Sequence, residues 1–132
     1  MMLTGDSQGS ALNVAHDVDL FIGIPEDEST LIHNHKYASS AAEYFARFGL
    51  APGKKHDGVV TNTIPEDRRE DFYASVCSEL KLLYEASAED KLLIVNTLQS
   101  QNHTVGYVGD GNNDSEAMSH ADVGFSMGGI GT

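Results

Sequence analysis

The stretch TVGYVGDGNND, residues 104–114, decides the predicted fold and site of this chain. Its first half, Thr104–Val108, is an apolar run of strand length, and its second half, Gly109–Asp114, is polar and contains two glycines. Ligands of open α/β sheets bind beyond the carboxyl ends of strands, where glycine lets the backbone turn tightly. The carboxylates of Asp110 and Asp114 are hard oxygen ligands of the kind that Mg²⁺ prefers. A polar turn is the alternative, but the flanking strand and helix favour a magnesium site.

Outward from this stretch, short apolar runs alternate with segments of helical periodicity. This alternation predicts an α/β fold, a parallel sheet with flanking helices. A polar loop at about residues 25–34 and an exposed turn at residues 51–58 interrupt the pattern. The predicted strands are Met1–Thr4, Gly58–Thr61, Lys81–Tyr84, Thr104–Val108 and Val123–Ser126.

Helices are predicted from apolar stripes and from capping signals. Capping boxes indicate that one helix begins after Thr63, which pairs with Glu66, and another after Ser87, which pairs with Asp90. A short helix is predicted at Asp114–His120. The expected buried faces of the longer helices are Ala11, Val14, Ala15 and Val18; Tyr37, Ala41, Tyr44, Phe45 and Phe48, ended by Gly49; Phe72, Tyr73, Val76 and Leu80; and Leu92, Ile94, Val95 and Leu98.

Composition limits the possible partners. The chain has 132 residues, with 20 acidic against 8 basic side chains and a formal net charge of −12. Such a surface repels phosphate backbones, so we expect no nucleic-acid partner. The single cysteine, Cys77, cannot form an intramolecular disulfide, which fits a reducing cytosolic setting. No apolar run approaches the ~18 residues of a membrane span, so we expect that the chain itself crosses no membrane.

Two further segments suggest phosphoryl binding. Thr4, Gly5 and Asp6 follow the first strand, where a hydroxyl and free amides at the start of a helix can hold a phosphoryl oxygen; an ordinary helix cap is the alternative. Lys91 lies in the first turn of a capped helix, where a cation opposes the helix dipole. A cation there can neutralise charge on transferring phosphoryl oxygens, although most single lysines are solvated surface groups.

Together and in this order, these residues resemble the P-type ATPases of the haloacid-dehalogenase-like superfamily. Met2–Asp6 is similar to the family's Met-x-Thr-Gly-Asp segment, and Ser87–Lys91 resembles the start of its Pro-Glu-x-Lys helix. Gly109–Asp114 resembles its Gly-Asp-Gly-x-Asn-Asp motif, and Ala121–Gly124 resembles the strand that follows it. The resemblance implies a partial haloacid-dehalogenase-like, Rossmann-like fold over residues 1–132, with a divergent insertion at about 26–58 that is similar to type II cation pumps.

The resemblance also implies roles for single residues. Asn113 and Thr4 would hydrogen-bond the phosphoryl group, and Gly5 would offer its amide. Lys91 would screen the phosphoryl charge, and Asp6 would help to place the nucleotide, which is ATP in this family.

The same resemblance implies a magnesium site. Asp110 would ligate Mg²⁺, and Asp114 would shape that site. Catalysis in such pumps is positioning and charge stabilisation around an aspartyl phosphate.

The chain also departs from the family pattern. The Asp-Lys-Thr-Gly-Thr segment with the phosphorylated aspartate is absent from these 132 residues, as are the nucleotide and actuator domains and the membrane helices. Asn112 and Glu116 stand where pumps generally have valine and proline. We therefore expect a fragment of an ATP-driven cation pump, inactive alone, that lies at the cytoplasmic face of a membrane as part of the full protein. Its unpaired sheet edge predicts poor solubility in isolation.

Two alternatives remain open at this stage. The first is a fragment of a soluble phosphatase of the same superfamily, which Asn112 and Met118 favour. Such an enzyme needs an Asp-x-Asp strand, and Asp17-Val18-Asp19 follows a helix instead. The second is a non-catalytic relic domain that binds nucleotide or Mg²⁺.

Overall fold

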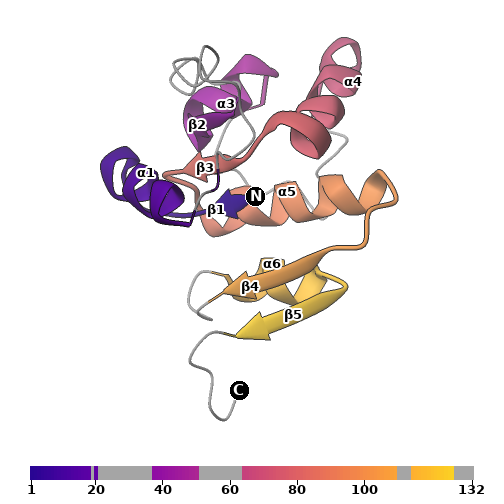
Figure 1. Cartoon of the computed structure of the whole chain (residues 1–132). Coiled ribbons are helices and arrows are strands. Elements are labelled where there is room, and N and C mark those ends of the chain that lie inside the picture. The colour runs from indigo at the N-terminus through magenta and orange to yellow at the C-terminus, as the bar shows by residue number, and fades with distance from the viewer. Residues whose placement is uncertain (19, 21–36, 51–63, 110–113, 127–132) are drawn as a thin grey trace.

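The computed structural model describes residues 1–18, 20, 37–50, 64–109 and 114–126. Over these residues the chain has an α/β fold with parallel strands and flanking helices, as predicted (Figure 1). Its elements are β1 (Met2–Leu3), α1 (Gln8–Asp17), β2 (Ala38–Ser40), α3 (Ala41–Arg47), α4 (Glu66–Ala74), a π-helical segment (Ser75–Glu79), β3 (Leu82–Tyr84), α5 (Ala88–Ser100), β4 (Gly106–Gly109), α6 (Ser115–His120) and β5 (Val123–Ser126).

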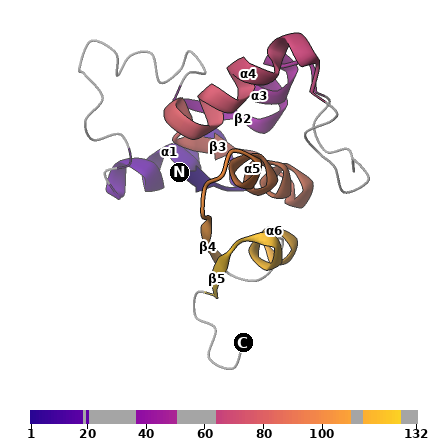
Figure 2. The same ribbon diagram turned by 90° about the vertical axis from the view of Figure 1, so that its right-hand side faces the viewer.

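The described strands form two parallel sheets. The first has the order β1-β3-β2, with Leu3 opposite Leu83 and Ser39 opposite Leu83 on the other side. The second pairs β4 with β5, so that Val108 lies opposite Phe125. In both views the β4–β5 pair lies below the first sheet and α5 (Figures 1 and 2). All of these strands are parallel within their sheets, so their carboxyl ends lie on one edge of each sheet.

The core is built on both sides of α5. An aromatic cluster packs Tyr44, Phe45 and Phe72 against α5, where it meets Ile94. A smaller cluster packs Val95 of α5 against Val105, Tyr107 and Ala117, next to β4 and α6. Helix α5 therefore links the two halves of the structure, which explains why it is the longest described helix and carries buried residues on more than one face.

Several predicted elements are confirmed. β1, β3, α5, α6 and β5 lie where the sequence places them, within one or two residues at each end. The capping box of α5 is present: the Ser87 hydroxyl accepts from the Asp90 amide at 3.2 Å, and the Asp90 carboxylate accepts from the Ser87 amide at 2.8 Å. These signals are local in the chain, which is why sequence reasoning finds them.

Two predictions about helices were wrong in detail. Tyr37 does not begin a helix, because residues 38–40 form the buried strand β2 and α3 begins only at Ala41. Pairing with β3 overrides the helical spacing of that segment, and its small residues carry no strand signal. In α5 it is Leu93 that is buried, whereas Leu92 is only partly buried, because the helix packs on two sides.

The predicted face of α1 is only half buried. Ala11 and Ala15 are fully buried against the first sheet, but Val14 is 42% and Val18 63% exposed. Other predictions lie outside the described residues: the strand Gly58–Thr61, the loop at 25–34, the turn at 51–58, the Thr63 cap and most of the insertion at 26–58. Helix α4 begins after Pro65, without a side-chain cap.

Candidate functional site

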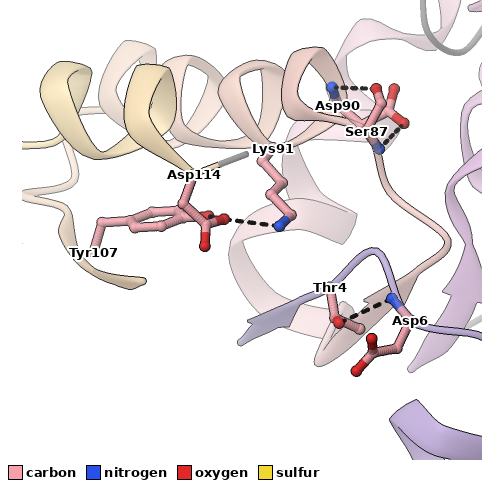
Figure 3. Close-up of polar contacts among 7 residues, drawn as sticks. All are labelled: Thr4, Asp6, Ser87, Asp90, Lys91, Tyr107 and Asp114. Carbon is pink, nitrogen blue, oxygen red and sulfur yellow. Dashed lines mark hydrogen bonds and ion pairs between the residues drawn. The ribbon is translucent and has the colours of Figure 1, made fainter. Parts of the chain in front are cut away.

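The candidate site is organised around an ion pair between α5 and the start of α6. The Lys91 Nζ lies 2.7 Å from the Asp114 Oδ1, and the two side chains are only 4% and 11% exposed (Figure 3). A buried charge is costly unless it is paired and hydrogen-bonded. The structure therefore explains the unfavourable position of Lys91 in the first turn of α5: the carboxylate of Asp114 compensates its charge.

A third residue joins this pair. The hydroxyl of Tyr107 donates a hydrogen bond of 2.7 Å to the same oxygen, Asp114 Oδ1. Tyr107 lies on β4, whose side chains alternate between exposed and buried, and its ring packs against Val95 and Ala117. No motif in the sequence marks this tyrosine. The available signal was a tyrosine at a buried position of an apolar strand, since a buried hydroxyl requires a partner.

Asp114 is close to the backbone of β4 as well. A Cβ added at Gly109 would lie 2.8 Å from both the Cβ and the Oδ2 of Asp114. This is a contact that a real Cβ could not make, so a glycine is required where β4 ends and the carboxylate lies against it. The close approach that the structure describes at Gly109 is that of the Asp114 side chain, itself one of the predicted ligand residues.

The Thr4–Asp6 segment is tied to the loop that leads into α5. The Thr4 amide donates to Leu83 O at 2.9 Å, and the Ala86 amide donates to Thr4 O at 2.9 Å. The Glu85 amide donates to Asp6 O at 3.0 Å, and Glu85 has a positive φ of 53° that shapes this loop. The segment therefore lies beside the start of the helix that carries Lys91.

Within that segment the Thr4 hydroxyl makes a local turn. Its Oγ1 accepts from the Asp6 amide at 3.1 Å (Figure 3). Gly5 and Asp6 are exposed, and helix α1 begins later, with Ser7 as its N-cap. The segment is accessible to a ligand, and the helix-start position predicted for it is two residues too early.

The two remaining predicted residues, Asp110 and Asn113, lie outside the described part of the chain. Among the residues that are described, no group of three or more His, Cys, Asp or Glu side chains could hold a metal ion. Asp114 is thus the described member of the predicted pair of magnesium carboxylates. The carboxylate of Asp90, close by in sequence to Lys91, is engaged in the capping box.

An apolar groove of about 450 Å³ runs between the two sheets. Its lining includes Leu3 of β1, Ile94 of α5 and Tyr107 of β4. Among the described strands, β1 and β4 are edge strands of their sheets, and both border this groove. Its rim is formed by large apolar side chains that are 42% to 63% exposed: Met1, Val14, Val18 and Val108.

No helix in the described ranges has both the length and the apolar character needed to cross a membrane. The chain matches no protein-family model.

Curated proteins, in contrast, match the whole chain. It is 32% identical over all 132 residues to the P-type sodium-transporting ATPase4 of Toxoplasma gondii, and 31% identical over the same length to the calcium-transporting ATPase 1 of Saccharomyces cerevisiae. It spans only 8% and 11% of these two relatives. A manganese-exporting P-type ATPase of Mycobacterium leprae is 50% identical over 48 residues, which are 36% of this chain and 7% of that protein.

Proposed function

We propose, because the chain belongs to the P-type cation-transporting ATPases, that it contributes the magnesium- and phosphoryl-binding half of the phosphorylation site of an ATP-driven cation pump. Relatives that match all 132 residues are named as sodium- and calcium-transporting ATPases. The chain spans about a tenth of their length, so the transport activity would belong to a longer protein in which this segment lies at the cytoplasmic face of the membrane.

The observation that carries this proposal is the buried contact among Lys91, Asp114 and Tyr107. Isolated buried ion pairs seldom add stability over apolar packing, because both charges must be desolvated. A pair of this kind at the carboxyl edge of a parallel sheet is better explained by a function for its charges. In the proposed site, the Lys91 ammonium screens the charge on a phosphoryl group, and Asp114 holds that ammonium in place.

The other residues take roles that follow from their positions. Thr4 and Gly5 would contact the phosphoryl oxygens together with Asn113, and Asp6 would orient the nucleotide end. The exposed position of Gly5 and Asp6, beside the start of α5, supports these assignments.

The donor chemistry of the site fits Mg²⁺. Asp114 and Asp110 would hold the ion, since hard carboxylate oxygens suit magnesium. When bound, Mg²⁺ supplies charge neutralisation to the phosphoryl group. The Asp114 carboxylate keeps its place at the end of β4 through Lys91 and Tyr107.

The rest of the pump is the proposed partner that completes the site. No Asp-Lys-Thr-Gly-Thr segment occurs in the 132 residues, so the phosphorylated aspartate would come from another part of the longer protein. The apolar groove between the edge strands β1 and β4 supports this arrangement, because a parallel strand placed there would pair with both edges. Such a strand would end at the same edge as Lys91 and Asp114.

The phosphatase alternative gains no support from the structure. Asp17, the first carboxylate of the Asp-x-Asp pattern, is the final residue of helix α1 rather than part of a strand. No structural observation among the described residues favours a second function over the pump segment.

The test is phosphoenzyme formation by the full-length protein in membrane vesicles. We expect an acid-stable phosphoenzyme from ATP that depends on Mg²⁺. Its rate of formation should fall at least ~100-fold in Lys91→Met, which keeps an unbranched side chain of similar length but removes its charge. Lys81→Met, at a lysine just before β3 and outside the site, is the matched control. A wild-type protein without phosphoenzyme, or a Lys91→Met variant as active as Lys81→Met, would refute the proposal.

A further inference from the structure

We infer that Tyr107 is a positioning residue of the candidate site: its hydroxyl fixes the carboxylate of Asp114 in the orientation in which it meets Lys91 and the divalent cation. What the site binds rests on the function proposed above. The contact between Tyr107 and Asp114 is part of the structure and does not depend on that proposal.

The ring and the hydroxyl of Tyr107 have separate roles. The side chain is 8% exposed, and its ring packs in the small cluster with Val95, Val105 and Ala117. A phenylalanine would fill the same space. Only the hydroxyl reaches Asp114, at the 2.7 Å that is usual for an O–H···O hydrogen bond. The ring therefore serves packing, and the hydroxyl serves to hold the carboxylate of Asp114.

The carboxylate of Asp114 has a second position available to it, at the start of α6. The residue occupies the N-cap position of α6, where an aspartate usually accepts hydrogen bonds from the first free amides of the helix. In this structure the side chain makes no such bond. Instead, its Oδ1 receives the Lys91 ammonium from α5 and the Tyr107 hydroxyl from β4. Two groups on two different elements thus hold the carboxylate away from the helix start.

Removal of the hydroxyl shifts this balance. In Tyr107→Phe, the Lys91 ammonium still holds Oδ1 but the hydroxyl of residue 107 is gone, and capping of α6 becomes the competing state for Asp114. The carboxylate then spends less time at the end of β4, beside Gly109, where the polar stretch with Asp110 begins. The expected consequence is a weaker site for Mg²⁺ with little change in the packing around the ring.

The experiment measures Mg²⁺ binding directly in the full-length protein without ATP. Hydrogen exchange, read by mass spectrometry on peptides that cover β4 and α6, is followed against Mg²⁺ concentration. We expect the concentration for half-maximal protection to rise roughly tenfold in Tyr107→Phe, as for the loss of one hydrogen bond to a charged group. Phosphoenzyme formation should show the same rise in the Mg²⁺ requirement, with a similar maximal level.

Tyr44→Phe is the matched control. It also removes a buried tyrosine hydroxyl with a 2.7 Å hydrogen bond, to Ser75, but in the aromatic cluster away from the site. We expect both variants to lower the melting temperature, and only Tyr107→Phe to change the Mg²⁺ dependence. An equal Mg²⁺ dependence in the two variants overturns the inference and leaves the proposed function standing. A wild-type protein that forms no phosphoenzyme and shows no Mg²⁺ protection overturns both.

Discussion

Asp114 shows how the site overrides a local preference. Aspartate at the start of a helix normally stabilises that helix through its own carboxylate, and α6 is short enough to need such help. Here the carboxylate serves the contact with Lys91 and Tyr107 instead. α6 is held by packing, since Ala117 is buried against β4 and α5.

Gly109 gives the first prediction at the scale of single residues. Gly109→Ala would place a Cβ 2.8 Å from the Asp114 side chain, so the carboxylate must move away from its two partners. We expect a loss of about 1–3 kcal/mol in the free energy of unfolding, as for other overpacked positions, and a weaker site for Mg²⁺. Denaturant unfolding measures the first effect and hydrogen exchange at α6 the second.

The matched control lies on the same strand. A Cβ at Gly106 would meet nothing within 4 Å, so Gly106→Ala should change stability by less than about 1 kcal/mol. Equal effects of the two alanines would show that the loss at Gly109 comes from the backbone of β4 and not from Asp114.

Sequence reasoning reached part of this site for physical reasons. Lys91 was identifiable because a cation in the first turn of a helix needs an explanation, and Asp114 because carboxylates cluster after an apolar strand. Their contact with one another could not be predicted, because 23 positions separate them in the chain and only packing of α5 on α6 brings them together. The role of the Tyr107 hydroxyl was missed for the same reason.

At the scale of elements, features set by residues close together in the chain were predicted correctly. Features set by contacts between distant segments were missed. The capping box of α5 lies within four consecutive residues and was predicted correctly. β2 was missed because nothing in Ala38–Ser40 favours a strand; it becomes one by pairing with Leu82–Tyr84 of β3. The burial of Leu93 likewise depends on α5 having neighbours on two sides.

The aromatic cluster gives a prediction about pH. Burial is the main cause that raises the pKa of Tyr44 above its usual value of 10.0, and Ser75 hydrogen-bonds its hydroxyl. Above pH 10 the unfolded chain loses this proton while the folded chain retains it, so the free energy of unfolding falls as the pH rises. We expect the melting temperature to fall steadily from about pH 10 upward, as measured by circular dichroism.

Tyr44→Phe isolates this effect. The variant should show a shallower fall of the melting temperature above pH 10, because a phenylalanine has no proton to lose. Some fall should remain, since burial and the neighbouring Glu43 and Glu85 also raise the pKa of Tyr84. An unchanged slope in the variant would assign the alkaline sensitivity to groups outside the aromatic cluster.

At the scale of the whole molecule, α5 packs against both sheets of the described residues, and the groove between these sheets leaves the edges of β1 and β4 open. A net charge of −12 opposes association between copies of the chain. The apolar rim of the groove is therefore better matched to a strand of the same longer protein than to a second copy. Sequence reasoning predicted an open edge but placed it at one side of a single sheet; the structure has it between two sheets.

This arrangement predicts different effects for two exposed valines on neighbouring strands. Val108 of β4 is 60% exposed and lines the groove, whereas Val123 of β5 is 48% exposed and does not line it. In the full-length protein a strand in the groove would cover Val108, so Val108→Lys should bury a charge and sharply reduce the amount of folded protein. Val123→Lys should be tolerated much better.

The measurement is the yield of monodisperse full-length protein after size-exclusion chromatography, with the lysine variants produced in parallel. A reduced yield for Val108→Lys alone means that the groove is filled in the longer protein, and restoration of that yield by Val108→Met would assign the loss to charge rather than to shape. Equal yields for both lysine variants would mean that no strand pairs with β4 in the full-length protein and that its edge stays exposed to water. In that case the phosphorylated aspartate of the proposed pump would have to reach Lys91 by a route other than a strand between the two sheets.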